Sequence, residues 1–134
     1  MGCFKRKIKV KAKSIKGDSI QKISSALTES MADGFRPTLA IVFLSVTQDR
    51  QAVSKMLDEN GIRIFGATTA GEFIDGEIEQ SSIIVMLLDM DPAHFKIDFF
   101  ETRRETALED AKKLGITGKQ TFNHPAFIIA KTGK

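Results

Sequence analysis

The residues best suited to bind a small molecule lie in the segment 66–72, which reads Gly-Ala-Thr-Thr-Ala-Gly-Glu. It begins at the end of an apolar run, 62–67, and combines two glycines, two hydroxyls and one carboxylate. Glycine lets the backbone approach a ligand closely, and hydroxyl and free N–H groups can hold a carboxylate or another small polar group. The Glu72 carboxylate can hold an ammonium group. The pattern therefore predicts a loop that binds a small polar ligand.

Two further candidates, Ser45 and Asp49, follow another apolar run at 39–44. Ligands of α/β proteins bind beyond the carboxyl ends of parallel strands. We therefore expect both residues to lie on the same edge of the sheet as the segment 66–72. The alternative is structural, because small residues after a strand are typical of a tight turn, and Ser, Thr and Asp are frequent helix caps.

The first half of the chain predicts strands that alternate with helices. Apolar residues at 8, 10 and 12 alternate with lysines, which is typical of a strand with one cationic face. The run at 39–44 is apolar at every position and predicts a central strand covered on both sides. Together with the strand at 62–67, these elements form two strand–helix–strand units, which predict parallel pairing and right-handed crossovers.

Capping residues mark the two helices between these strands. Asp18 and Gln21 form a capping box for a first helix, which Gly34 follows. Thr47 or Asp49 can cap a second helix, which ends at 60–61, an Asn-Gly pair.

The second half of the chain predicts a change in the strand pattern. A turn at 75–76 predicts a small hairpin, and 82–88 and 95–99 predict an antiparallel strand pair. Thr102 and Glu105 form a capping box for a third helix that Gly115 closes, and 125–130 predicts a last strand. The expected fold class is α/β: a mixed, largely parallel sheet of about six strands with about three flanking helices.

Length and composition indicate one globular domain over residues 1–134. Hydrophobic residues are 42% and charged residues 28% of the chain, a mix that excludes a disordered protein. The single Cys3 cannot form an internal disulfide, which favours a reducing compartment. No apolar run is long enough to span a membrane, and the N-terminus has no signal-peptide core. We therefore expect a cytoplasmic protein without membrane insertion.

The net charge of +3 does not indicate a nucleic-acid-binding protein. Beyond position 16 the chain carries 13 Lys and Arg against 17 Asp and Glu, a net charge of −4. The positive charge is therefore confined to the first predicted strand, where alternating lysines are typical of a solvated face or a protected edge. We expect no nucleic-acid partner. The basic residues of that first segment are Lys5, Arg6, Lys7, Lys9, Lys11, Lys13 and Lys16.

An enzyme is the main alternative to a binding domain, and the sequence offers it little support. Thr68 and Thr69 are internal, so no N-terminal amine can activate them, and the Gly-x-Ser-x-Gly motif of hydrolases is absent. His94 and His124 lie in predicted turns and not at metal-ligand spacing. We therefore expect no catalytic residue, metal or cofactor. An enzyme acting on a small polar metabolite through the loop 66–72, and a protein-interaction domain, remain alternatives.

Segment 66–73 resembles the signature of the FIST N-terminal domain family, in which a strand ends in Gly-Cys-Ser-Thr-Ala-Gly-Glu followed by an apolar residue. Similar surroundings extend the resemblance over 38–100, and more loosely to the last predicted strand. Three positions depart from the family pattern. Ala67 replaces a common Cys, Thr68 replaces a common Ser, and Phe73 replaces a smaller aliphatic residue.

The resemblance implies an intracellular sensory domain for signal transduction that binds a small ligand, with an amino acid or a similar metabolite as the expected class. The motif positions carried over as ligand-binding residues are Thr68, Thr69, Gly71 and Glu72, with Ser45 and Asp49 as further candidates. Family members continue into a FIST C-terminal domain and can be attached to a signalling output module. Since the chain stops soon after 125–130, we expect it to be an incomplete FIST N-terminal domain.

Overall fold

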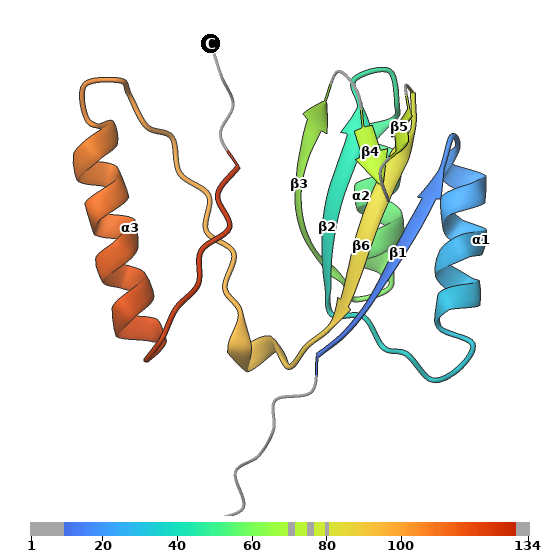
Figure 1. Cartoon of the computed structure of the whole chain (residues 1–134), viewed down its shortest axis with the longest axis horizontal. Coiled ribbons are helices and arrows are strands. Elements are labelled where there is room, and N and C mark those ends of the chain that lie inside the picture. Colours follow the sequence, from blue (N-terminus) through green and yellow to red (C-terminus); the bar gives the residue numbers. More distant parts are fainter. Residues whose placement is uncertain (1–9, 70–71, 75–76, 80, 131–134) are drawn as a thin grey trace, which may run out of the picture. The chain divides into compact units, whose positions relative to one another are not determined.

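The apolar run at 39–44 forms the core of a central strand, as expected. In the computed structural model, strand β2 (Leu39–Ser45) lies between β6 (Ile83–Asp89) and β3 (Arg63–Thr69), with β1 (Lys11–Gly17) beyond β6 (Figure 1). Six of the seven β2 residues are buried, because a strand with neighbours on both edges and apolar residues on both faces is largely withdrawn from water.

The structure describes residues 10–69, 72–74, 77–79 and 81–130. The chain divides into two compact units, Met1–Pro92 and Ala93–Lys134. The first unit contains the four-stranded sheet and two of the helices.

The expectation of a largely parallel sheet is wrong. Only β2 and β3 pair in parallel, whereas β6 pairs antiparallel with both β1 and β2. After β3 the chain passes through a hairpin of β4 (Glu72–Ile74) and β5 (Glu77–Glu79), and β6 then enters between β1 and β2. Since β1 and β2 both oppose β6, they run in the same direction but are not neighbours. The expected small hairpin is confirmed, and its turn at 75–76 lies outside the described residues.

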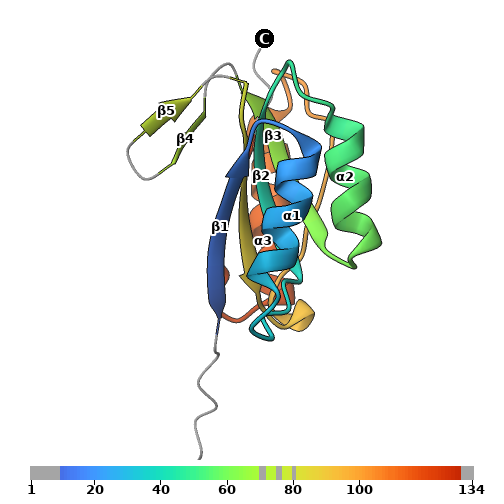
Figure 2. The same cartoon turned by 90° about the vertical axis from the view of Figure 1, so that its right-hand side faces the viewer.

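Helices α1 (Ile20–Ser30) and α2 (Arg50–Glu59) cover one face of this sheet (Figure 2). Ile23 of α1 and Leu57 of α2 are fully buried against Val85 and Leu87 of β6 and the other apolar residues of the core. Burying a side chain of this size contributes about 1.5–3 kcal/mol to stability. This packing fixes α2 against the sheet and so places the start of α2 beside the ends of β2 and β3.

The caps of the two helices differ partly from the expectation. The cap of α1 is Ser19 and not Asp18, because the Ser19 hydroxyl accepts a hydrogen bond from the backbone N–H of Lys22. Asp18 instead forms an ion pair with the Lys22 side chain at 2.8 Å. Helix α1 ends at Ser30 with Met31 as its C-cap, so Gly34 lies beyond the helix end. Helix α2 ends at Asn60 as expected, and Gly61 has the positive φ of +72° that favours glycine after a helix.

The basic strand β1 forms an edge of the sheet. Lysines on an edge strand discourage pairing with another chain, so this position fits the protective role expected for them. Lys13 points toward the end of α1, where its Nζ donates to the Ser30 carbonyl oxygen at 2.7 Å and to the Asp33 carboxylate at 2.8 Å. The same Nζ lies 4.9 Å from the centre of the Phe35 ring. This lysine therefore has a structural role at the C-terminal end of α1.

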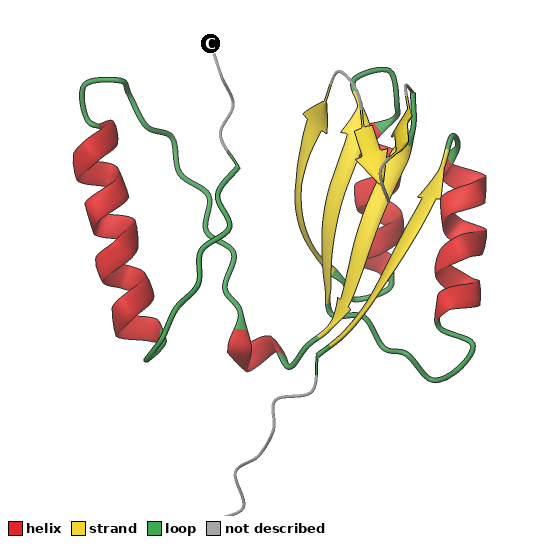
Figure 3. Cartoon of the chain, in the orientation of Figure 1, coloured by secondary structure: helices red, strands yellow, loops and turns green. Residues whose placement is uncertain are grey.

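The second unit contains helix α3 (Ala107–Thr121), flanked by segments without regular structure (Figure 3). The expected strands at 95–99 and 125–130 are therefore wrong. A one-turn 3₁₀ helix, η1 (Pro92–His94), spans the boundary between the two units in the sequence. None of the described side chains in 93–130 is buried, so these apolar segments have no core within their own unit to hold them as strands.

Helix α3 also begins and ends later than expected. Its N-cap is Thr106, and Thr102 donates a hydrogen bond to the Asp110 carboxylate at 2.5 Å instead of capping the helix. The helix continues through Gly115, since one interior glycine costs only about 1 kcal/mol. Leu108, in the first turn of the helix, is 71% exposed. None of the helices in the described ranges is long and apolar enough to cross a membrane.

Candidate functional site

The parallel pairing of β2 and β3 brings the carboxyl ends of these strands together. In the register, Leu44 lies opposite Thr68 and Ser45 lies opposite Thr69. The end of β2 and the motif residues 66–69, which lie in β3, therefore meet at one edge of the sheet, as predicted. This edge is the place where α/β folds bind ligands.

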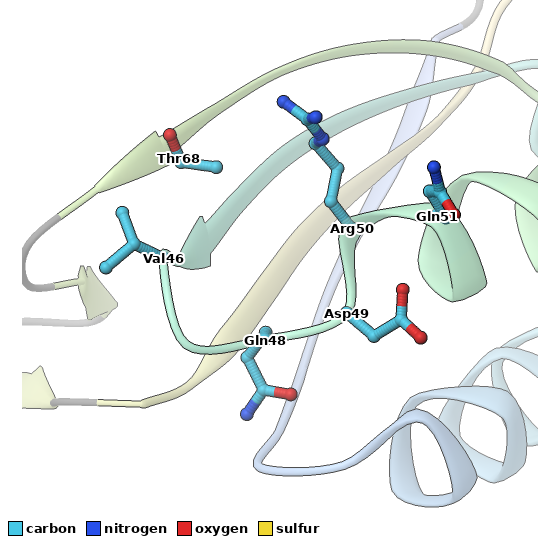
Figure 4. A pocket seen from close by; sticks show the side chains of 6 residues that line it. All are labelled: Val46, Gln48, Asp49, Arg50, Gln51 and Thr68. Carbon is cyan, nitrogen blue, oxygen red and sulfur yellow. The ribbon is translucent and has the colours of Figure 1, made fainter.

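A cavity of about 330 Å³ lies at this edge, between the end of β3, the β2–α2 loop and the start of α2 (Figure 4). Two of the predicted site residues, Thr68 and Asp49, line it. The lining is mostly polar and contains one cation and one carboxylate. Its residues are Val46, Gln48, Asp49, Arg50, Gln51 and Thr68.

Gln48 holds the loop that forms one wall of this cavity. Its Nε2 donates hydrogen bonds to the carbonyl oxygens of Asp18 at 2.9 Å and Ser81 at 2.6 Å. Asp18 precedes α1 and Ser81 precedes β6, so one side-chain amide connects three loops at the same end of the sheet. The β2–α2 loop is therefore fixed in place by groups that lie outside the cavity.

Ser45 does not line the cavity, but its hydrogen bonds hold the start of the β2–α2 loop. It is 5% exposed, and its Oγ lies 3.0 Å from the Thr47 hydroxyl. The backbone N–H of Ser45 donates to the Ser82 carbonyl oxygen at 3.0 Å. These hydrogen bonds connect the end of β2 to the start of β6.

Asp49 has the structural role that the sequence left open. It is the N-cap of α2, and its Oδ1 accepts a hydrogen bond from the Ala52 backbone N–H at 3.1 Å. A capping carboxylate accepts a hydrogen bond from one of the free N–H groups at the helix start. Its negative charge also interacts favourably with the positive end of the helix dipole. Asp49 therefore begins α2 and at the same time places a carboxylate beside the cavity.

Thr68 is exposed at the end of β3, so its hydroxyl can reach a ligand. Gly66, two residues earlier, lies very close to β2. A Cβ atom at this position would lie 2.7 Å from the Val42 carbonyl oxygen, nearer than real Cβ atoms approach. The first glycine of the motif is therefore explained by strand packing, whereas the hydroxyl of Thr68 has no such structural explanation.

The remaining motif residues are only partly described. Thr69 ends β3 and Glu72 begins β4, but the side chains of both lie outside the described residues, as does Gly71. Four lining residues were not among the predicted site residues: Val46, Gln48, Arg50 and Gln51. The sequence feature that could have indicated Arg50 is its place directly after the helix cap, at the expected edge of the sheet.

A second cavity, of about 400 Å³, lies in the second unit between α3 and the segment 96–101. Three of its charged groups have partners of their own. Lys96 lies 3.5 Å from Asp98, and the Asp110 carboxylate accepts hydrogen bonds from Thr102 and Thr106. These hydroxyl donors lower the pKa of Asp110, Thr102 having the larger effect. This cavity contains no residue of the predicted site.

The described ranges contain no group of three or more His, Cys, Asp and Glu side chains that could hold a metal ion. The chemistry available at the first cavity is therefore that of hydroxyl, amide, guanidinium and carboxylate groups. These groups suit the binding of a small polar molecule by hydrogen bonds and charge.

Comparison with known proteins identifies the family. A family model described as the FIST N domain matches residues 38–132 of the 134-residue chain. The matched range contains the motif 66–72 and every lining residue of the first cavity, whereas β1 and α1 precede it. FIST domains are sensory domains of signal transduction and are not a known enzyme family. No curated protein matches the chain.

Proposed function

The chain belongs to the FIST N domain family, and from this membership we propose that it senses an amino acid or a similar small polar metabolite. The ligand binds in the cavity at the carboxyl ends of β2 and β3, and binding is the signal, without chemical conversion of the ligand. The protein acts in the cytoplasm.

One observation carries this proposal: Thr68 and the start of α2 line the same polar cavity. Thr68 belongs to the motif that resembles the family signature, and the cavity lies where α/β folds bind ligands. Its volume, about 330 Å³, is at the lower end of the range for small-molecule sites. An amino acid is of suitable size and polarity for it.

The roles of the motif residues are part of the proposal. The hydroxyls of Thr68 and Thr69 and the backbone of Gly71 hydrogen-bond polar groups of the ligand, and Glu72 binds its ammonium group. Asp49 and Ser45 shape the edge of the site, one as the cap of α2 and the other by fixing the end of β2.

The partners follow from the family. We propose that a FIST C-terminal domain and a signalling output module act together with this domain in the parent protein. Ligand binding stabilises the bound form of the domain and so changes the contacts it offers to the output module.

A thermal-shift screen tests the proposal directly. The whole 134-residue chain is heated with each of the common L-amino acids and with a set of small polar metabolites. A compound that binds the native state raises the unfolding temperature, and the rise grows with the ratio of its free concentration to its dissociation constant. The proposal requires at least one compound to do so, and a flat response to every compound would contradict it.

Glu72 is tested with a compound found in that screen. Glu72→Gln keeps the size of the side chain and one acceptor oxygen but removes the charge, so the binding free energy for an amino acid should weaken by about 1–3 kcal/mol. Glu59→Gln, at the far end of α2, is the matched control and should leave the affinity unchanged. Equal binding by both variants would remove Glu72 from the site.

A further inference from the structure

Among the described residues, Arg50 is the single positively charged side chain that lines the first cavity. It lies at the first position of α2, and its guanidinium extends along β2 and β3 toward the side of Thr68, whereas the Asp49 side chain points the other way (Figure 4). Its side chain is exposed. A guanidinium so placed can reach a molecule held between the start of α2 and the end of β3.

Within the described part of the chain, no carboxylate forms an ion pair with Arg50. Other cations of the same unit do have such partners: Lys13 pairs with Asp33, and Lys22 pairs with Asp18. The five N–H donors of the Arg50 guanidinium are therefore available to a ligand. Their planar arrangement matches two oxygens of a carboxylate, which form two parallel charge-assisted hydrogen bonds.

The N-terminus of α2 does not compete with Arg50 for such a group. Asp49 already places a negative charge there, and its Oδ1 accepts a hydrogen bond from one of the free N–H groups, that of Ala52, at 3.1 Å. Among the described lining residues Arg50 is the one cation, so a bound dianion such as phosphate would keep part of its charge without a counter-charge there. A ligand with a single carboxylate, or one that also carries an ammonium group, matches the balanced charge of the lining.

We propose that Arg50 is the residue that recognises the carboxylate of the ligand and thereby selects small monocarboxylates, amino acids included. This inference rests on the proposed function, because it assigns a role within the same cavity. Thr68 then supplies a further hydrogen bond on the β3 side, and the uncharged remainder of the ligand faces Val46 and Gln51.

The test uses matched pairs of probes on the whole 134-residue chain. The common L-amino acids, acetate and propionate are compared with their uncharged carboxamides by isothermal titration calorimetry. Arg50→Gln removes the charge, Arg50→Lys keeps the charge without the planar fork, and Arg36→Gln removes a charge at the opposite end of β2. Arg50 is exposed, and unchanged unfolding temperatures of the variants confirm that each one folds.

The inference predicts that at least one carboxylate binds and that its carboxamide binds about 10- to 100-fold more weakly. Arg50→Gln should cause a loss of the same size, Arg50→Lys a smaller loss, and Arg36→Gln none. Carboxylate binding that survives Arg50→Gln, or carboxamides that bind as tightly as the acids, would overturn the role of Arg50 while leaving a ligand-binding function intact. If neither these probes nor any compound of the thermal-shift screen binds, both proposals fail.

Discussion

The side-chain amide of Gln48 donates a hydrogen bond of 2.6 Å to the carbonyl oxygen of Ser81, 33 residues away in the sequence. A second hydrogen bond from the same nitrogen reaches the carbonyl oxygen of Asp18. These bonds join the loops that precede α1, α2 and β6. The shape of the cavity between α2 and β3 therefore depends on groups from the whole of one end of the sheet.

Replacing Gln48 should loosen this end of the sheet. Gln48→Ala removes both hydrogen bonds and leaves two carbonyl oxygens without this donor, so the free energy of unfolding should fall by about 1–2 kcal/mol. Urea unfolding measures the change. Gln51→Ala, on the exposed first turn of α2, is the matched control and should stay within about 0.5 kcal/mol of the parent chain. Equal stability of the two variants would contradict the structural role of Gln48.

A methyl group at Gly66 should destabilise the sheet. The added Cβ would lie 2.7 Å from the Val42 carbonyl oxygen, and this backbone group cannot move without disturbing β2. We expect Gly66→Ala to lower the free energy of unfolding by about 1–3 kcal/mol. At Gly115, inside α3, a Cβ meets no atom within 4 Å, so Gly115→Ala should increase the helical circular-dichroism signal. A neutral Gly66→Ala variant would mean that the strands are farther apart than described.

The packing of α2 against the sheet can be tested with two valines of the same unit. Val53 is 2% exposed and Val46 is 70% exposed. Val53→Ala should lower the free energy of unfolding by about 2 kcal/mol, because it removes buried methyl groups and leaves a cavity. Val46→Ala should change it by less than about 0.5 kcal/mol. A reversed order of the two effects in urea unfolding would show that α2 presents a different face to the sheet.

The ion pair of Lys13 makes a prediction about pH. The hydrogen bond from Lys13 holds the pKa of Asp33 below its ordinary value, and the backbone N–H of Phe35 adds a smaller effect in the same direction. A folded-state pKa that is depressed gives stability above the ordinary Asp pKa, which is lost as the pH falls through the folded value. In an NMR titration of the carboxyl carbons, Lys13→Met should raise the pKa of Asp33, whereas Lys11→Met should leave it unchanged. No difference between the two variants would exclude Lys13 as the cause.

Local sequence patterns predicted the elements of the first unit well, because each pattern reflects a local physical requirement. The continuous apolar run of β2 predicted a central strand, and the polar residue before α2, Asp49, predicted its cap. The position of β6 between β1 and β2 could not be predicted in this way. Strand order depends on pairing between residues 39 to 49 positions apart for β2 with β6 and 66 to 78 positions apart for β1 with β6, which leaves no mark on local periodicity.

In the second unit, local patterns predicted strands that the described residues do not form. The segments at 95–99 and 125–130 have the alternation or apolar run of strands, but a strand also needs a pairing edge, and the structure gives them none. Of the residues that line the first cavity, Thr68 and Asp49 were predicted from residue type and place in the expected fold. Arg50 was missed because an exposed arginine in a first helical turn looks like an ordinary surface residue until β3 is placed beside it.

The central claim, that the cavity between α2 and β3 binds a small polar ligand, is most directly tested by NMR. Amino acids and small carboxylates are titrated into the ¹⁵N-labelled 134-residue chain while the backbone amide signals are followed. The account predicts that the signals of Gln48, Arg50 and Thr68 shift in a saturable way, while those of Lys13 and Asp33, near the other end of the sheet, stay in place. Saturable shifts confined to other parts of the chain, or no shift with any compound, would contradict it.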